Sequence, residues 1–284
     1  MDLGVSVVIP TFNRCSLVTR TLDSLLTQTH KDFEVIVVDD GSVDRTKESV
    51  EPYVGRTIRY TRTPHRGTPF AWNLGVNEAR EEFVFLSGDD VVVDSHCLSA
   101  LAAALDRVDA KTFGAVAPRL VYTLNVHSSA VGNAGAYAHI EPWSGDVAGS
   151  FDVEAKEVVE VPILHGYSMI RKSAFLDVGG FDERTYTGNY WREETDLWLR
   201  FKRKGYKLYY QPKAKIYCQK SLTRGGQWSN VGEKRSLYEY YVVRNHRNYL
   251  KKFYGKERFF MLPTFIIRRM YEWLMQMHAH VQHH

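Results

Sequence analysis

The sequence has few cysteines and no long hydrophobic segment, and both absences narrow the kind of protein that it encodes. Its three cysteines, Cys15, Cys97 and Cys218, are widely spaced and form no C-x-x-C pair. An odd number of dispersed thiols fits a reducing compartment better than a disulfide framework. No secretory leader pattern opens the chain, and the longest apolar stretch, 259–267, is far shorter than the ~20 residues that span a bilayer. We therefore predict a cytoplasmic protein.

Two common phosphate-binding motifs are also missing. No G-x-G-x-x-G follows the first apolar run and no G-x-x-x-x-G-K-[ST] occurs, so neither a dinucleotide-binding fold nor a P-loop is indicated. The 284 residues are 44% hydrophobic and 25% charged, which is ordinary for a globular protein with a large core. A phosphate-bearing ligand would therefore need another means of binding.

Three apolar runs have the length and the β-branched content of buried strands, and each ends in polar residues. They are Val5–Ile9, followed by Pro10, Thr11, Asn13 and Arg14; Phe33–Val38, followed by Asp39 and Asp40; and Phe83–Leu86, followed by Ser87, Gly88, Asp89 and Asp90. Helical patterns separate the runs, an alternation typical of a parallel, doubly wound α/β sheet. The loops after such strands meet at one edge, which predicts a ligand site there.

Asp89 and Asp90 are the most informative pair at this edge. Adjacent carboxylates repel each other unless a cation or hydrogen-bond donors compensate their charge. Mg²⁺ or Mn²⁺ would do so and would also bind phosphate oxygens, whereas the alternative is that the pair caps the next helix. A diphosphate could then be held by the metal, with its base or ribose at Asp39 or Asp40.

Taken together, these motifs resemble glycosyltransferase family 2. The resemblance rests on residues 5–14 (VSVVIPTFNR), 37–44 (VVDDGSVD), 71–76 (AWNLGV), the Asp89-Asp90 pair, 179–183 and 193–200, and it covers roughly residues 5–220. It implies the GT-A fold, in which helices flank a Rossmann-like mixed sheet. It also implies a metal-dependent, inverting transferase that moves a sugar from a UDP- or GDP-sugar to a hydroxyl of a glycan or lipid-linked saccharide, as in polysaccharide biosynthesis.

The resemblance assigns donor-binding roles to residues at the sheet edge. The nucleotide sugar is expected to contact Pro10, Thr11, Asn13, Arg14, Asp39, Asp40, Arg66, Gly67, Asn73, Asp89 and Asp90. The cofactor, Mg²⁺ or Mn²⁺, is expected on Asp90 and Asp89.

A second acidic segment, 190–196, would supply the general base, because a sugar hydroxyl is a poor nucleophile until its proton is removed. Glu194 matches the base of the family motif, and Asp196 is the alternative. Trp191 and Trp198 could stack on an acceptor sugar, but core packing explains Trp198 equally well.

Two positions depart from the family pattern. Gly88 replaces the first Asp of the usual D-x-D motif, so the metal relies mainly on Asp90. Cys218 stands where a histidine often completes the metal site, and a thiol suits Mg²⁺ or Mn²⁺ poorly. A degenerate, non-catalytic module that only binds the nucleotide sugar is therefore the alternative function.

The chain is predicted to consist of a GT-A domain and an extension. Residues 1–225 form the domain, with a nucleotide-binding half (1–95) and an acceptor half (96–225), and 226–284 form a basic, amphipathic helical extension. Such an extension is typical of a helix on an anionic membrane surface. Packing on its own domain or on a second subunit explains it equally well, so a peripheral position at the inner face of the membrane and a homo-oligomer both stay open. No motif for reading nucleic acid accompanies the basic residues, and we predict no nucleic-acid partner.

Overall fold

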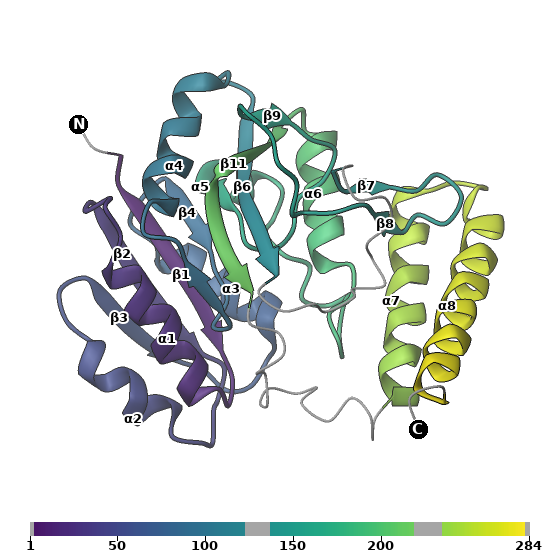
Figure 1. The fold of residues 1–284 in the computed structure, drawn as a ribbon, viewed down its shortest axis with the longest axis horizontal. Helices are drawn as coiled ribbons and strands as arrows, with labels where there is room; N and C mark the ends of the chain where they lie inside the picture. Colours follow the sequence, from purple (N-terminus) through teal and green to yellow (C-terminus); the bar gives the residue numbers. More distant parts are fainter. Residues whose placement is uncertain (1–2, 123–136, 219–234, 282–284) are drawn as a thin grey trace.

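The computed structural model describes residues 3–122, 137–218 and 235–281, which form a mixed sheet with helices on both faces (Figure 1). The main sheet has the strand order β3-β2-β1-β4-β10-β6-β11-β5, and β9 pairs with β11. Its strands are β1 (Val5–Thr11), β2 (Phe33–Asp39), β3 (Ile58–Arg62), β4 (Phe83–Leu86), β5 (Val91–Val93), β6 (Phe113–Tyr122), β9 (Val159–Glu160), β10 (Met169–Arg171) and β11 (Lys207–Cys218). A separate hairpin pairs β7 (His139–Ile140) with β8 (Val147–Ala148).

Helices follow most of the strands. They are α1 (Cys15–Leu26), α2 (Thr46–Val50), α3 (Thr68–Glu78), α4 (Cys97–Ala104), α5 (Lys172–Asp177), α6 (Glu193–Arg203), α7 (Arg235–Phe253) and α8 (Arg258–Val281), with short 3₁₀ turns at Glu51–Tyr53 and Leu105–Arg107. None of the described helices is both long and apolar enough to cross a bilayer. The predicted boundary between residues 225 and 226 lies outside the described residues.

The direction of the strands differs from the parallel sheet that their alternation with helices predicted. β1 pairs in parallel with β2 and β4, and β2 with β3. However, β10 lies antiparallel between β4 and β6, and β5 lies antiparallel to β11. The sheet is therefore mixed, as the family resemblance implied. The alternation of strands and helices predicts parallel pairing only where a helical crossover joins two neighbouring strands. The neighbours β4 and β10 are instead joined by a long connection that includes most of the predicted acceptor half.

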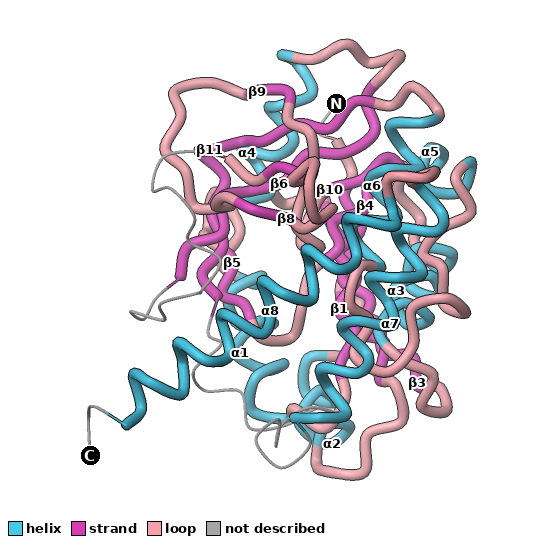
Figure 2. Tube along the Cα trace, turned by 90° about the vertical axis from the view of Figure 1, so that its right-hand side faces the viewer, coloured by secondary structure: helices cyan, strands magenta, loops and turns pink. Residues whose placement is uncertain are grey.

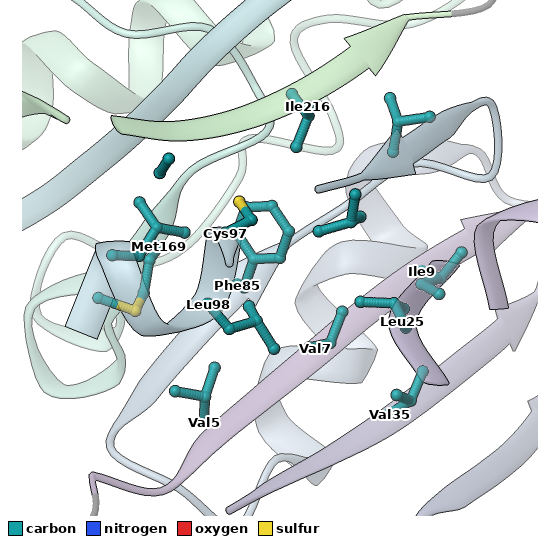
Figure 3. Packing of buried hydrophobic residues seen from close by; sticks show 14 of the residues in the cluster. Val5, Val7, Ile9, Leu25, Val35, Phe85, Cys97, Leu98, Met169 and Ile216 are labelled. Atoms are coloured by element: carbon teal, nitrogen blue, oxygen red, sulfur yellow. The ribbon is translucent and has the colours of Figure 1, made fainter. Parts of the chain in front are cut away.

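The core lies on both faces of the sheet because successive strand residues point to opposite sides. Val7 packs with Leu25 of α1 and Leu98 of α4 on one face (Figure 3). Its neighbour Val8 packs with Trp72 of α3 on the other face. Burying one such side chain stabilises the fold by about 1.5–3 kcal/mol, so the two faces together keep the loops at the sheet edge in place.

Helices α7 and α8 pack against each other at the end of the molecule opposite α1 and α2 (Figure 1). A polar cluster joins them to the body: Arg192, just before α6, pairs with Asp146 and donates its Nε–H to Nδ1 of His246 at 3.0 Å. Nε2 of His246 lies 2.8 Å from the carbonyl oxygen of Ser144, and Phe265 of α8 stacks on the His246 ring at 3.7 Å. Only a neutral imidazole can accept at one nitrogen and donate at the other.

This cluster makes the stability of the protein sensitive to acid. Burial, together with the charge of Arg192, lowers the pKa of His246 from 6.5 to about 3. Between these values the unfolded chain binds a proton that the folded chain does not, so stability falls as the pH drops. We expect the free energy of unfolding to fall by up to about 1.4 kcal/mol per pH unit more in the wild type than in His246→Gln. Urea denaturation across this range measures both slopes, and equal slopes would contradict a neutral His246.

Candidate active site

A hollow opens at the sheet edge where β1, β2 and β4 end. The register of β1 and β2 sets Thr11 level with Asp39. The antiparallel β10 begins beside the end of β4, which brings the loop before β10 to the same edge. The hollow is lined by Pro10, Thr11, Phe12, Arg14, Asp40, His65, Gly67, Thr68, Trp72, Gly88, Asp89, Asp90, Tyr167 and Tyr190. It therefore draws on segments from both predicted halves of the domain.

The acid pair in this hollow already has a cation between its carboxylates. Nη1 of Arg14 lies 2.8 Å from Oδ1 of Asp89 and 3.3 Å from Oδ2 of Asp90. Burial acts to lower the pKa of Arg14, but the charges of the two carboxylates outweigh it and raise that pKa. The guanidinium thus supplies the charge compensation that the sequence predicted for a metal ion.

Neutral donors hold the other oxygens of the pair. Thr11 donates its hydroxyl to Oδ2 of Asp89 at 2.8 Å, and Tyr167 donates its hydroxyl to Oδ1 of Asp90 at 3.0 Å. Burial raises the pKa of Asp89 to about 6, an effect that Arg14 partly offsets and that the charge of Asp90 increases. The Tyr167 ring also fills the space that a side chain on Gly88 would need, so an Asp at position 88 could not be added without moving Tyr167.

Asp40 organises the opposite wall of the hollow. Its two oxygens accept the backbone N–H groups of Arg66 and Gly67, at 2.7 and 2.8 Å, and Oδ2 lies 2.7 Å from Nδ1 of His65. Gly67 has φ +100°, which side chains disfavour, and the Tyr190 hydroxyl occupies the place of any Cβ there. The His65 ring stacks on Phe12 at 4.1 Å. This wall therefore offers flat rings and a carboxylate side by side.

The acids of the second segment lie at the N-terminus of α6, where the helix dipole favours negative charge. The Glu194 carboxylate lies against Gly166, where a Cβ would overlap it, and Gly166 precedes the Tyr167 that holds Asp90. Burial raises the pKa of Glu193 well above its usual range, and the charge of Glu194 adds to the rise. Glu194 thus lies against the loop that carries Tyr167, and Glu193 is its neighbour in the chain.

Two predicted site residues are enclosed in the protein, which corrects their proposed roles. Asp196 is fully buried and is held by Tyr186 at 3.1 Å, Arg200 at 2.5 Å and Lys252 at 2.6 Å. A base needs a free lone pair at the substrate, so Asp196 serves as an anchor for α6 and α7. Trp198 is also fully buried, in the core beside Phe201, and cannot stack on an acceptor.

Four predicted donor contacts do not line the hollow with their side chains. Asp39 is fully buried and accepts from the Ser42 backbone and the Tyr60 hydroxyl. The side-chain oxygen of Asn13 accepts from the backbone of Val43 and Asp44. Asn73 bonds to Phe181 and Glu183, and the Arg66 side chain reaches Glu183 at 3.2 Å. These side chains shape the loops around the hollow. Pro10, Thr11, Arg14, Asp40, Gly67, Asp89 and Asp90 do line it.

Several lining residues were not predicted from the sequence. Phe12, His65, Thr68, Trp72, Tyr167 and Tyr190 complete the hollow. Phe12 lies between Thr11 and Asn13, both of which were predicted to contact the donor, so its position in the loop could have identified it. Tyr190 begins the segment 190–196 that the sequence singled out, so its place in the chain was also a signal. Tyr167 had none, because it reaches the edge only through the reversed direction of β10.

The described residues contain no group of three or more His, Cys, Asp or Glu side chains arranged to hold a metal ion. Cys218 is buried and pairs in register with Val91, the residue after Asp90. This register brings Cys218 close to the acid pair.

Residues 6–153, just over half of the chain, match the family described as "Glycosyl transferase family 2", and residues 83–278 match "Glycosyl transferase family group 2". The chain belongs to glycosyltransferase family 2. It is 28% identical over 266 residues to an uncharacterised protein, y4gI, of Sinorhizobium fredii, covering 87% of this chain and 27% of the relative. It is 38% identical over 91 residues to the uncharacterised glycosyltransferase EpsJ of Bacillus subtilis, covering 31% and 26%. The matched part spans between 13% and 58% of the curated relatives' lengths.

Solved structures share the fold. The mannosyltransferase PcManGT of Pyrobaculum calidifontis, in complex with GDP-Man and Mn²⁺, superposes with a TM-score of 0.60 at 17% identity, covering 92% of this chain and 68% of that one. GalNAc-T7 with UDP, GalNAc and Mn²⁺ gives 0.62 at 18% identity, covering 76% and 44%. TarS of S. aureus gives 0.60 at 20% identity, covering 93% and 43%. The mixed sheet with flanking helices is thus the GT-A fold.

Proposed function

We propose that the chain is a metal-assisted, inverting glycosyltransferase domain that moves a sugar from a UDP- or GDP-sugar to an acceptor hydroxyl. The observation that carries this proposal is the Asp89–Asp90 pair, which holds a cation at the carboxyl edge of the sheet in a member of family 2. Structural neighbours described as complexes with GDP-Man or UDP support a nucleotide-sugar donor.

The acid pair fits Mg²⁺ or Mn²⁺ in its chemistry. Hard divalent ions prefer carboxylate oxygens, and the guanidinium of Arg14 acts as a stand-in that marks where positive charge is stabilised. One oxygen of each aspartate faces that position, and both aspartates line the hollow. We propose Asp90 and Asp89 as the ligands, with water and the donor diphosphate completing the set. When bound, the ion would neutralise charge that develops on the leaving diphosphate.

The remaining residues bind and orient the reactants. Asp40, His65 and Phe12 form the wall that suits a base and ribose, because it offers flat rings and a hydrogen-bond acceptor. Glu194 removes the proton of the acceptor hydroxyl as that oxygen attacks the anomeric carbon. Attack from the face opposite the leaving group inverts that carbon in one displacement. Trp191, half-buried beside Arg192, is the aromatic candidate for the acceptor.

One observation favours the alternative, a non-catalytic module that binds a nucleotide sugar. Arg14 already neutralises the acid pair, and Gly88 and Cys218 add no ligand to it. Such a module would bind donor without turning it over. Release of UDP or GDP from the donor, with or without acceptor, separates the two functions.

Asp90→Ala tests the metal ligand. We expect Mn²⁺ to strengthen nucleotide diphosphate binding by the wild type, and Asp90→Ala to lose this enhancement while remaining folded. A thermal-shift titration with Mn²⁺ or EDTA measures the effect, since a ligand stabilises the state that it binds. Asp23→Ala, an exposed acid on α1, is the matched control. Wild-type binding that is indifferent to EDTA would argue against the metal.

Arg14→Gln tests competition between the guanidinium and the metal. Charged hydrogen bonds contribute about 1.5–3 kcal/mol each, and Mn²⁺ must break those of Arg14 to reach the pair. We therefore expect the variant to bind Mn²⁺ about tenfold more tightly than the wild type in the absence of nucleotide. Electron paramagnetic resonance of free Mn²⁺ measures this affinity, with exposed Arg20→Gln on α1 as control. An unchanged affinity would mean that Arg14 does not occupy the metal position.

Glu194→Gln tests the general base. Glutamine keeps the size and hydrogen bonding of the side chain but cannot take up the proton, so kcat is expected to fall by about 10²-fold or more with little change in donor KM. Glu193→Gln is the matched control, because it makes the same change in the neighbouring acid at the N-terminus of α6. If Glu193→Gln caused the larger loss, the role of base would pass to Glu193.

A further inference from the structure

The outer half of α8 is apolar and uncovered by any described residue. Large apolar side chains that are about half or more exposed recur along it: Phe259, Phe260, Ile267, Met270, Tyr271, Leu274 and Met275. At 3.6 residues per turn, these positions fall on one half of the helix circumference, and no Asp, Glu, Lys or Arg between 258 and 275 shares that half. Figure 2 shows the C-terminal part of α8 extending away from the sheet. A contiguous exposed patch of this kind marks an interaction surface.

The charged residues of α8 lie on its inner half, which faces the protein. A basic helix that binds a membrane surface through its charges would instead expose them. Arg268 pairs with Glu141 at 2.6 Å and with Glu272 at 3.0 Å. Arg269 pairs with Glu239 of α7 at 2.7 Å. The arginines of α8 thus face the protein together with the buried Met261 and Phe265, while the exposed apolar residues form the outer half. The ion pairs fix the orientation of the helix with its apolar half exposed.

A cationic hollow lies between α7 and the loop before α6. It is lined by Arg184, Thr185, Thr187, Arg244, Asn248, Lys251 and Lys252, with no acid among them. Lys252 pairs with Asp182 and Asp196, and Arg244 bonds to the carbonyl and hydroxyl of Thr187. Arg184 and Lys251 are exposed and have no acidic partner within the described part of the chain. Cations, hydroxyls and an amide around one hollow suit a phosphate group.

An apolar groove connects the cationic hollow to the outer half of α8. Leu250, Phe259, Leu262 and Pro263 line it together with Arg247, Lys251 and Arg258. Lys251 lines both the cationic hollow and the apolar groove, and Phe259 of the groove belongs to the outer half of α8. A phosphate in the cationic hollow would therefore have a path for a hydrocarbon chain directly beside it.

A second copy of this chain fits the same surface less well. A two-fold interface brings the same patch of both copies together, which would set one cationic hollow near the other at a cost in repulsion. An anionic lipid surface complements the cations and covers the apolar half of α8 at once.

We propose that α7 and α8 bind a phosphate-bearing lipid at a membrane surface, with the phosphate in the cationic hollow, the chain along the groove and the outer half of α8 among the acyl chains. A second, polar hollow has Arg66, Asn73, Gly180, Glu183, Arg184 and Lys252 among its lining residues. It shares Arg184 and Lys252 with the cationic hollow, and Arg66 connects it to the loop at Gly67. A lipid carrier held here would present its sugar toward the candidate active site. Only the identification of this lipid as the carrier of the acceptor sugar rests on the proposed function.

The test is co-sedimentation at low ionic strength with phosphatidylcholine vesicles, with and without phosphatidic acid. We expect the protein to sediment with the vesicles that contain phosphatidic acid. Lys251→Glu should lower partitioning about fivefold or more, since each cation near an anionic surface contributes about that factor. Leu274→Ser should lower it by about the same factor or more, because it removes an apolar side chain that would be buried among the acyl chains. Leu26→Ser is the matched apolar control, because both leucines are 53% exposed on helices. Lys47→Glu on α2, also exposed, is the charge control, and both controls should sediment as the wild type does.

Three results would overturn the proposal. The protein could stay in the supernatant with both kinds of vesicle. It could bind inorganic phosphate, measured by calorimetry with a Lys251→Glu control, and ignore phosphatidic acid vesicles, which would make the hollow a phosphate site alone. It could form dimers that Leu274→Ser dissociates in sedimentation velocity while ignoring vesicles, which would assign the surface to a second copy. None of these readouts uses nucleotide or sugar transfer, so failure of the proposed function leaves them unaffected.

Discussion

The candidate active site depends on the charge balance of two adjacent, largely buried carboxylates. Asp89 and Asp90 can stay together because Arg14 lies between them and hydroxyls from Thr11 and Tyr167 take up their other oxygens. These donors come from the end of β1, the residue before α1 and the loop before β10. The pair therefore ties together segments far apart in the chain, and any ligand that binds there must supply what Arg14 supplies now.

A second polar cluster links α6, which carries the candidate base, to the C-terminal helices. Arg192 immediately precedes Glu193 and Glu194 and is held by Asp146 and His246, while Asp196 of the same helix is held by Lys252 of α7. The N-terminus of α6 is thus fixed from both sides by buried or half-buried ion pairs, whose loss would leave uncompensated charge. The same contacts therefore connect the start of α6, which carries the candidate base, to α7 of the proposed lipid surface.

The C-terminal helices show why a pattern of charges along a sequence is ambiguous. Basic and apolar residues alternate in α8, and that alternation is compatible with a membrane-surface helix, with packing on the domain and with a second subunit. Arg268 and Arg269 turn inward to Glu141 and Glu239, so the helix uses its charges to dock on the protein and presents its apolar half outward. Packing on the domain, which the sequence offered as an alternative to a membrane-surface helix, thus leaves an apolar half of the helix uncovered.

The sequence alone was sufficient for the strands β1, β2 and β4 and for the convergence of Thr11, Asp40, Asp89 and Asp90, because apolar runs and the geometry of parallel strands are local or near-local properties. It was also sufficient for the family. It could not determine that Arg14 lies on the acid pair, that Tyr167 reaches Asp90, or that Asp39, Asp196 and Trp198 are enclosed. Those outcomes depend on contacts between residues many positions apart, on the reversed direction of β10 and on which face of a helix meets its neighbour. Only packing in three dimensions decides such contacts, since the same residue types serve equally well as ligands, anchors or core.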